Sequence, residues 1–347
     1  MAKIEELDIN FAVDKSVSKF QYRQLWDIPE ISVEGLFPNT FCRMDPMVLP
    51  QMSKGVQELA WNTASGVVRF RTTSKKFGIR MQLRSGEDMS HMPRTGSSGV
   101  DIYIGTGANC RFLQSTRPNS GETYVETECI LPSEEQDVTL YLPLYNGLVS
   151  FELGFFEGVY PLAPKDRSRG HVVFYGSSIT QGGCASRTGN SYVNMLGRML
   201  DSSVHNFGFS GCGKGEVEMA NYIATLPMDA FVFDYDHNAS DVKALRETHL
   251  PFLKQIIHTH PGLPVVIVTK PDFDADPLAS QRRDVIWESY FWAKAQGIPC
   301  VFIDGQTLFN GPMRDACTVD GCHPNDLGFY RMAMAIYPAL DTLLHKK

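Results

Sequence analysis

The second half of the chain alternates short apolar runs with helical stretches, and this alternation constrains the fold more than any other feature. The apolar runs are 171–176, 203–208, 230–236, 264–270 and 300–304. The helical stretches that follow them lie near 190–200, 215–225, 241–259, 278–296 and 326–344. Consecutive parallel strands need a crossover connection, which is usually a helix. Five strand–helix units in a row therefore predict an α/β fold, with a parallel sheet covered by helices on both faces.

Residues 1–165 show a different pattern, with short β-type runs between turn residues and no helical periodicity. The runs are 67–72, 78–83, 100–104, 124–127, 138–142 and 148–153. This spacing predicts an antiparallel β-sandwich, or jelly roll. A long polar insertion at 84–99 interrupts the runs, and loops of this length are usually functional or disordered.

The two patterns meet at 161–170, where proline, glycine and charged residues concentrate. We expect a linker there, which gives a β-sandwich domain over 1–165 and an α/β domain over 171–347. A chain of 347 residues is long enough for two hydrophobic cores.

Charge and hydropathy exclude some classes of partner. The formal net charge of −7 argues against a nucleic acid or an anionic membrane surface. No apolar run approaches the roughly 18 residues of a membrane-spanning helix. Lys3, Glu5 and Glu6 stand where a secretory signal would be apolar. The chain as given is therefore predicted to be cytoplasmic, although a trimmed leader would leave no trace. The oligomeric state stays open.

The cysteines favour neither a zinc site nor a disulfide framework. There are 8 of them, scattered without Cys-x-x-Cys pairs. We expect free thiols, although Cys317 and Cys322 are close enough in sequence to form a bridge.

The first apolar run of the α/β half ends in Gly-Ser-Ser at 176–178. Open α/β folds place their sites at the carboxyl ends of the strands, so Ser178 is a candidate nucleophile. A serine hydroxyl is a weak nucleophile and needs a base, which in turn needs an orienting group.

His323 and Asp320 follow the fifth apolar run, just before the last helical stretch. On a turn, Asp-x-x-His spacing lets the carboxylate reach Nδ1 while Nε2 faces outward. We therefore predict His323 as the base and Asp320 as its orienter. Capping of the last helix is the alternative role for Asp320, and a surface or core position is the alternative for His323.

Hydrogen-bond donors for an oxyanion are expected at two other strand ends. The glycine-rich stretch 208–215 follows the second run and can expose backbone N–H groups. Asn238 follows the third run and could supply a side-chain amide, with a local turn or helix cap as its alternative role. His237 is interpreted as a neighbour of the site rather than the base.

The stretch 208–215 also comes close to a phosphate-binding loop, Gly-x-x-x-x-Gly-Lys. Gly215, however, stands where serine or threonine should hold Mg²⁺, and the loop follows the second strand rather than the first. The dinucleotide fingerprint fits worse, because Glu216 occupies its third glycine position. Nucleotide binding is therefore a minor alternative.

Together these blocks resemble the SGNH (GDSL-type) esterase and acylhydrolase superfamily. Ser178 matches the nucleophile position, with Ser177 in place of the usual aspartate. Gly211 matches the backbone oxyanion donor, and the Asp-x-x-His block lies at 320–323. The block around Asn238 departs from the usual Gly-x-Asn-Asp. The resemblance implies a flavodoxin-like, three-layer hydrolase domain.

The stretch 99–103 resembles the motif that names the GxDLY domain, which precedes SGNH domains; 60–62 and 65–70 also fit it. This implies a β-sandwich lid or accessory module beside an esterase site.

The implied reaction is acyl transfer through Ser178, with His323 as the base and Asp320 holding the imidazole. The N–H groups of Ser178 and Gly211 and the amide of Asn238 would bind the oxyanion, and no metal or cofactor is needed. The expected substrate is a small-molecule or carbohydrate ester. An acetyl ester of a carbohydrate is the leading candidate, mainly because of the family resemblance. The alternative is a glycan-binding module on a degenerate hydrolase scaffold.

The part of the insertion at 89–96 is predicted to reach over the site, with His91 or Arg94 touching substrate. A solvated loop is the alternative. His237 is also expected near substrate.

Overall fold

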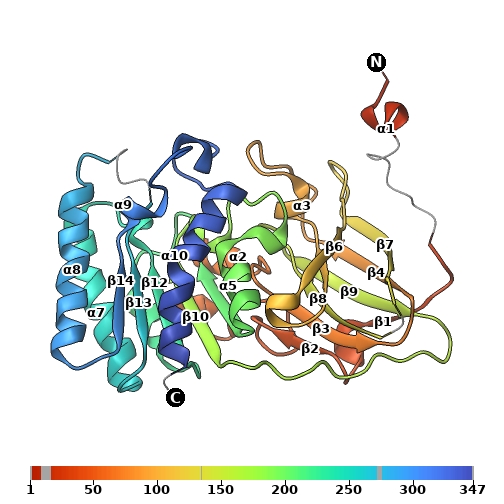
Figure 1. Cartoon of the computed structure of the whole chain (residues 1–347), viewed down its shortest axis with the longest axis horizontal. Coiled ribbons are helices and arrows are strands. Elements are labelled where there is room, and N and C mark those ends of the chain that lie inside the picture. Colours follow the sequence, from red (N-terminus) through yellow and green to blue (C-terminus); the bar gives the residue numbers. More distant parts are fainter. Residues whose placement is uncertain (1, 9–16, 134, 272–275, 346–347) are drawn as a thin grey trace.

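The computed structural model describes residues 2–8, 17–133, 135–271 and 276–345. A β-rich N-terminal half lies beside a C-terminal half in which helices flank a parallel sheet (Figure 1). The parallel strands are β10 (His171–Gly176), β11 (Ser203–Gly208), β12 (Ala230–Asp234), β13 (Val265–Val268) and β14 (Cys300–Ile303). Their order is β11-β10-β12-β13-β14, the flavodoxin order. The predicted α/β fold is confirmed.

Helices cover both faces of this sheet because its strands are apolar on both sides. The long helices are α5 (Tyr192–Leu200), α6 (Val217–Ala224), α7 (Val242–Thr259), α8 (Ala279–Ala295) and α10 (Asp326–Leu344). In β10, Val172 and Phe174 pack in one core with α5 and α10. Val173 and Tyr175 point the other way, into a core with α6, α7 and α8.

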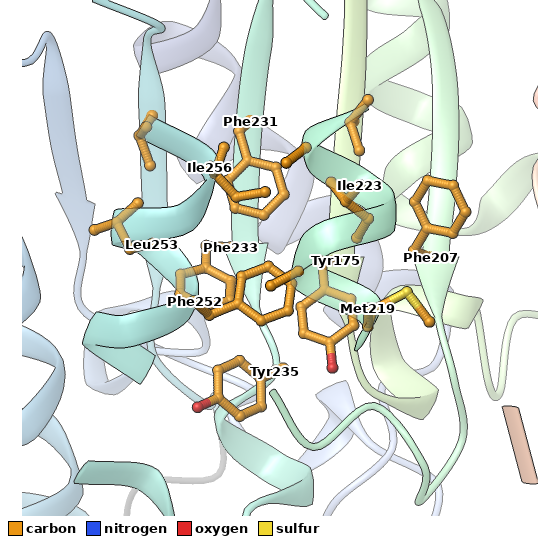
Figure 2. Packing of buried hydrophobic residues seen from close by; sticks show 14 of the residues in the cluster. Tyr175, Phe207, Met219, Ile223, Phe231, Phe233, Tyr235, Phe252, Leu253 and Ile256 are labelled. Carbon is orange, nitrogen blue, oxygen red and sulfur yellow. The ribbon is translucent and has the colours of Figure 1, made fainter. Parts of the chain in front are cut away.

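The second of these cores is rich in aromatic rings (Figure 2). Phe207 of β11 and Phe231 and Phe233 of β12 are fully buried. The Tyr175 ring stacks on Phe252 of α7, with ring centroids 4.6 Å apart. Each such side chain stabilises the fold by about 1.5–3 kcal/mol through burial. This packing holds in place the strand ends that carry the polar loops.

The N-terminal half is a sandwich of two antiparallel sheets, as predicted. One sheet contains β1 (Gln21–Gln24), β9 (Leu148–Phe155), β4 (Lys76–Leu83) and β7 (Tyr124–Ile130), in that order. The other contains β2 (Ser32–Glu34), β3 (Val67–Thr72), β8 (Gln136–Tyr141), β5 (Asp101–Ile104) and β6 (Arg111–Ser115). Their inward side chains form a third core, which includes Phe70, Ile79 and Phe151.

Short helices complete the chain. The α-helical ones are α1 (Ile4–Leu7), α2 (Lys54–Leu59), α3 (Arg94–Ser97), α4 (Ser178–Gln181) and α9 (Gly305–Leu308). The 3₁₀ turns are Leu25–Asp27, Leu49–Gln51, Gly107–Asn109, Thr188–Asn190, Asp236–Asn238 and Asp315–Cys317. The insertion at 84–99 is more ordered than its polarity indicated, because it holds α3 and a β-bridge between Met89 and Met92.

The two halves share buried polar contacts. Arg43, fully buried, donates from Nη1 to the carbonyl oxygens of Asn206 and Gly208, both at 2.7 Å. Its Nη2 donates to the Leu59 carbonyl at 2.7 Å. Asp101, in the 99–103 motif, accepts from Arg187 at 2.7 Å. The division into domains over 1–165 and 171–347 stays a prediction.

The 8 cysteines are free thiols, and Cys317 and Cys322 are not bridged. Among the described residues, no helix is both long and apolar enough to cross a bilayer.

Candidate active site

The turn after β10 presents Ser178 at the carboxyl edge of the sheet. Ser177 caps the short helix α4, and its Oγ accepts a hydrogen bond from the backbone N–H of Ile179 at 3.2 Å. A serine hydroxyl here does the capping that the more usual aspartate would do. Ser178 is therefore held at the first position of the helix, with its side chain directed toward the loop before α10.

That loop brings His323 and Asp320 to Ser178. The Nε2 of His323 lies 2.9 Å from the Ser178 Oγ. Its Nδ1 lies 2.7 Å from Oδ2 of Asp320. The other carboxylate oxygen, Oδ1, accepts the backbone N–H groups of His323 at 2.7 Å and Cys322 at 2.9 Å. Gly321 makes this tight turn possible, with φ at +84°.

Electrostatics favour one arrangement of the imidazole proton. Burial alone would raise the pKa of Asp320, but hydrogen bonds from His323 and Cys322 outweigh it and lower the pKa to about 2. The carboxylate is thus ionised at neutral pH and favours a proton on Nδ1 of His323, leaving the Nε2 lone pair for Ser178. Asp320 does not cap α10; Asn325 does, accepting from the N–H groups of Leu327 and Gly328.

Two backbone N–H groups in the turns after β10 and β11 are available for an incoming ligand. In the loop after β11, the N–H groups of Phe209, Ser210, Cys212 and Gly213 all donate within the protein. Those of Gly211 and of Ser178 donate to no acceptor in the described part of the chain. Gly211 is exposed and has a φ of +65°, a conformation that suits glycine.

Asn238 lies at the end of the 3₁₀ turn after β12 and faces the same loop. Its Nδ2 donates to the Phe209 carbonyl at 2.9 Å. An amide carries two hydrogens, and the second has no acceptor among the described residues. The turn is anchored by buried Asp236, which accepts from Nε of Arg282 at 2.9 Å and from the N–H of Lys270 at 3.1 Å.

The predicted substrate-proximal residues differ in their surroundings. His91 is exposed, and its ring centroid lies 6.0 Å from that of His323. His237 is half-buried, with Nδ1 3.9 Å from Sγ of Cys322. Arg94 instead braces the insertion, donating to the carbonyls of Gly86 and Glu122, both at 2.7 Å. A contact of any of the three with substrate stays a prediction.

The loop 208–215 is unsuited to a phosphate. The carboxylate of Glu216, the residue before α6, accepts the backbone N–H of Lys214 at 3.0 Å and the hydroxyl of Tyr175 at 3.1 Å. A negative charge thus stands where a phosphate loop would receive its anion. In the described residues, no three His, Cys, Asp or Glu side chains form a group that could hold a metal ion.

Sequence reasoning missed a buried carboxylate behind the nucleophile turn. Asp234, the last residue of β12, is 4 % exposed. It accepts the Tyr192 hydroxyl at 2.8 Å and the Thr180 hydroxyl at 3.2 Å. Burial raises its pKa to about 7, against the lowering effect of the Tyr192 hydrogen bond. The sequence did carry a signal for Asp234, namely an acidic residue at the end of an otherwise apolar run.

Two family profiles match the chain, one in each half. The profile of the GDSL-like lipase/acylhydrolase family matches residues 169–341. The profile for the N-terminus of SGNH-hydrolase-type esterases, GxDLY, matches residues 22–159. No curated protein sequence matches the chain significantly.

Solved structures resemble the chain over nearly its whole length. A protein described as a GDSL-like lipase from Bacteroides ovatus is 26% identical, with a TM-score of 0.84 and coverage of 94% of this chain and 98% of that one. The salicylyl-acyltransferase SsfX3 of a tetracycline biosynthetic pathway is 16% identical, with a TM-score of 0.76 and coverage of 93% and 97%. The acetyl xylan esterase Est2A from Butyrivibrio proteoclasticus is 14% identical, with a TM-score of 0.63 and coverage of 94% and 99%.

The last two similarities show a shared fold. The two profiles and the B. ovatus structure show more: this chain belongs to the GDSL-like lipase/acylhydrolase family of carboxylic ester hydrolases and carries the GxDLY domain at its N-terminal side.

Proposed function

We propose that this hydrolase cleaves short acyl esters, with acetyl as the acyl group and a carbohydrate as the alcohol, and that Ser178 is its nucleophile. One observation carries the proposal: an unbroken hydrogen-bonded path runs from Asp320 through His323 to the Ser178 hydroxyl, at 2.7 and 2.9 Å. Such a path is the arrangement that activates a serine hydroxyl.

In the proposed reaction, Ser178 Oγ attacks the ester carbonyl while Nε2 of His323 takes its proton. Asp320 holds the imidazole and stabilises its positive charge. The tetrahedral intermediate collapses, and the alcohol leaves with the proton from His323. Water then attacks the acyl-enzyme by the same route, which releases the acid and restores Ser178.

The developing oxyanion would be bound by the N–H groups of Ser178 and Gly211 and by the second hydrogen of the Asn238 amide. None of these three donors has an acceptor within the described residues. Donors that are already in place cost little reorganisation during the reaction, and each is worth roughly 10²–10³ in kcat.

Two observations support a polar alcohol. A cavity of about 390 Å³ lies in the β-rich half, with Tyr145 in its wall. Glu58, Asn62 and Arg84 are among its lining side chains, and such groups suit a ligand rich in hydroxyls. The Tyr145 hydroxyl donates to the Ser178 carbonyl, so one residue of the cavity wall also contacts the nucleophile turn. In addition, one protein of shared fold is an acetyl xylan esterase.

The direct test of the nucleophile is Ser178→Ala. This variant should retain the unfolding temperature of the wild type, lose nearly all hydrolysis of p-nitrophenyl acetate, and no longer react with a fluorophosphonate probe. Ser177→Ala is the matched control, since it keeps the proposed nucleophile and should still be labelled. Full esterase activity in Ser178→Ala would refute the proposal.

A substrate panel tests the finer assignment. We expect acetylated sugars and p-nitrophenyl acetate to be hydrolysed with higher kcat/KM than esters of octanoate. A wild-type protein that binds glycans but neither hydrolyses any ester nor reacts with the probe would favour a glycan-binding module on a degenerate scaffold.

A further inference from the structure

One tyrosine of the β-rich half reaches both loops of the candidate active site. Tyr145 lies between β8 and β9, and its hydroxyl donates to the backbone carbonyl of Ser178 at 3.1 Å. Burial raises the pKa of the same phenol, and the Ser210 side chain lies close enough to it to oppose that rise. The phenol of Tyr145 therefore hydrogen bonds to the nucleophile residue and lies near the residue that precedes Gly211.

A second link runs parallel to the first. Gln181, fully buried at the end of α4, accepts the backbone N–H of Ser210 at 3.0 Å. Its amide nitrogen donates to the carbonyl of Leu144 at 3.1 Å. The peptide on the N-terminal side of Ser210 is thereby fixed, and its N–H is used within the protein while the N–H of Gly211 stays available.

The segment that makes these contacts is itself held by the β-rich half. The backbone N–H of Tyr145 donates to the Ser97 carbonyl at 3.0 Å, and that of Leu144 donates to the Gly96 carbonyl at 3.3 Å. The side chain of Asn146, the next residue, donates to Ser85 O at 2.8 Å and to Ser98 Oγ at 3.1 Å. Hydrogen bonds thus hold the backbone of Tyr145 and of both its neighbours in place.

We propose that Tyr145 is a positioning residue for ester hydrolysis, which sets the loop of Gly211 relative to Ser178 so that both N–H groups meet the same oxyanion. This rests on the proposed function. The two donors come from separate strand ends, β10 and β11, and catalysis needs them to converge on one oxygen. A misplacement of about 1 Å can cost about 10²-fold in rate. The β-rich half would then be part of the catalytic apparatus and not only a substrate-binding module.

The test is Tyr145→Phe, which removes only the hydroxyl. With p-nitrophenyl acetate we expect kcat to fall about 10-fold, with KM within about twofold, because ground-state binding does not use the oxyanion donors. The second readout is a short alkylboronic acid, whose tetrahedral adduct on Ser178 mimics the intermediate. Its inhibition constant should rise by the same factor as kcat/KM falls.

Tyr222→Phe is the matched control. The Tyr222 hydroxyl also joins the two halves, accepting the backbone N–H of Asp45 at 2.9 Å, and its ring packs against Phe207. In the described part of the chain it makes no hydrogen bond to Ser178, Ser210 or Gly211. This variant should lose some thermal stability and keep the wild-type kcat and boronate inhibition constant.

Wild-type kcat in Tyr145→Phe, or a loss of kcat without weaker boronate binding, would overturn the inference. So would an equal loss in Tyr222→Phe. If Tyr145→Phe does not fold, Ser210→Ala removes the hydroxyl that lies near this phenol and must show the same parallel loss. A wild-type protein that hydrolyses no ester would refute the proposed function itself, whereas an active wild type with an unaffected Tyr145→Phe would refute only this role.

Discussion

At the scale of single residues, the site contains side chains that form the proposed catalytic path and a buried carboxylate behind the nucleophile turn. Ser178, His323 and Asp320 could be singled out from the sequence because each follows an apolar run that predicts a strand. Asp234 could not, because its importance comes from burial. It faces Tyr192 and Thr180, which are 42 and 54 residues away in the sequence.

Asp234 makes the stability of the protein depend on pH. Burial raises its pKa to about 7, whereas in an unfolded chain it is about 3.9. Between these values the folded state holds a proton that the unfolded state has lost, so this residue lowers the free energy of unfolding as pH rises. In Asp234→Asn this effect is absent. Relative to the wild type, the variant should gain about 2–3 kcal/mol between pH 5 and pH 8. Denaturant titrations of both proteins at the two pH values measure this gain, and an unchanged difference would contradict it.

At the scale of elements, the sequence predicted the buried strands better than the edge strands. Strands β10 and β3 lie at the predicted residues because an apolar or alternating pattern marks them. Strands β1, β2 and β6 were missed. All three are sheet edges with at most partial burial, so their side chains carry no hydrophobic pattern. The turn between β10 and α4 was predicted, but only the structure shows how Ser177 caps it.

The cap on α4 is tested by Ser177→Ala. Losing the hydrogen bond to the Ile179 N–H should lower the free energy of unfolding by about 1 kcal/mol. It should also lower kcat, because Ser178 is the next residue. Ser177→Asp keeps an acceptor at this position and is expected to be more active than the alanine variant. Thermal unfolding and p-nitrophenyl acetate hydrolysis measure both effects. Equal kcat values in the alanine and aspartate variants would show that the cap does not affect catalysis.

At the scale of the whole molecule, the two halves are joined by polar groups that the sequence does not mark. Arg43 precedes no motif and has no carboxylate hydrogen-bonded to it among the described residues. Its guanidinium instead satisfies carbonyl oxygens of two segments and lies 4.5 Å from the centroid of the Phe209 ring. The 99–103 motif was recognised by resemblance, but its contact with Arg187 required the structure. Patterns along the sequence predict each core, but they do not reveal polar contacts between residues that are far apart in the sequence.

Arg43→Met keeps most of the apolar stem and removes the donors. The carbonyl oxygens of Asn206 and Gly208 then lose this donor, at about 1–3 kcal/mol for each one left buried and unsatisfied, whereas that of Leu59 still accepts the Asn62 N–H at 3.1 Å. We expect a fall of about 3 kcal/mol or more in the free energy of unfolding. Arg43→Lys should recover little of it, since one ammonium cannot reproduce the planar fork. Chemical denaturation of the three proteins is the measurement, and full recovery by lysine would contradict the expectation.

The position of Arg43 also bears on how the chain assembles. Strand β11 is the edge of the parallel sheet, and an uncovered edge is a template on which another chain can add a strand. Arg43 occupies two of its carbonyl oxygens, and β2 of the other half lies beside it. Domains fold in the order in which they are synthesised, N-terminal first. The residues that cover this edge, Arg43 and β2, are therefore synthesised and folded before β11. The nascent hydrolase half then need not expose β11 to other chains.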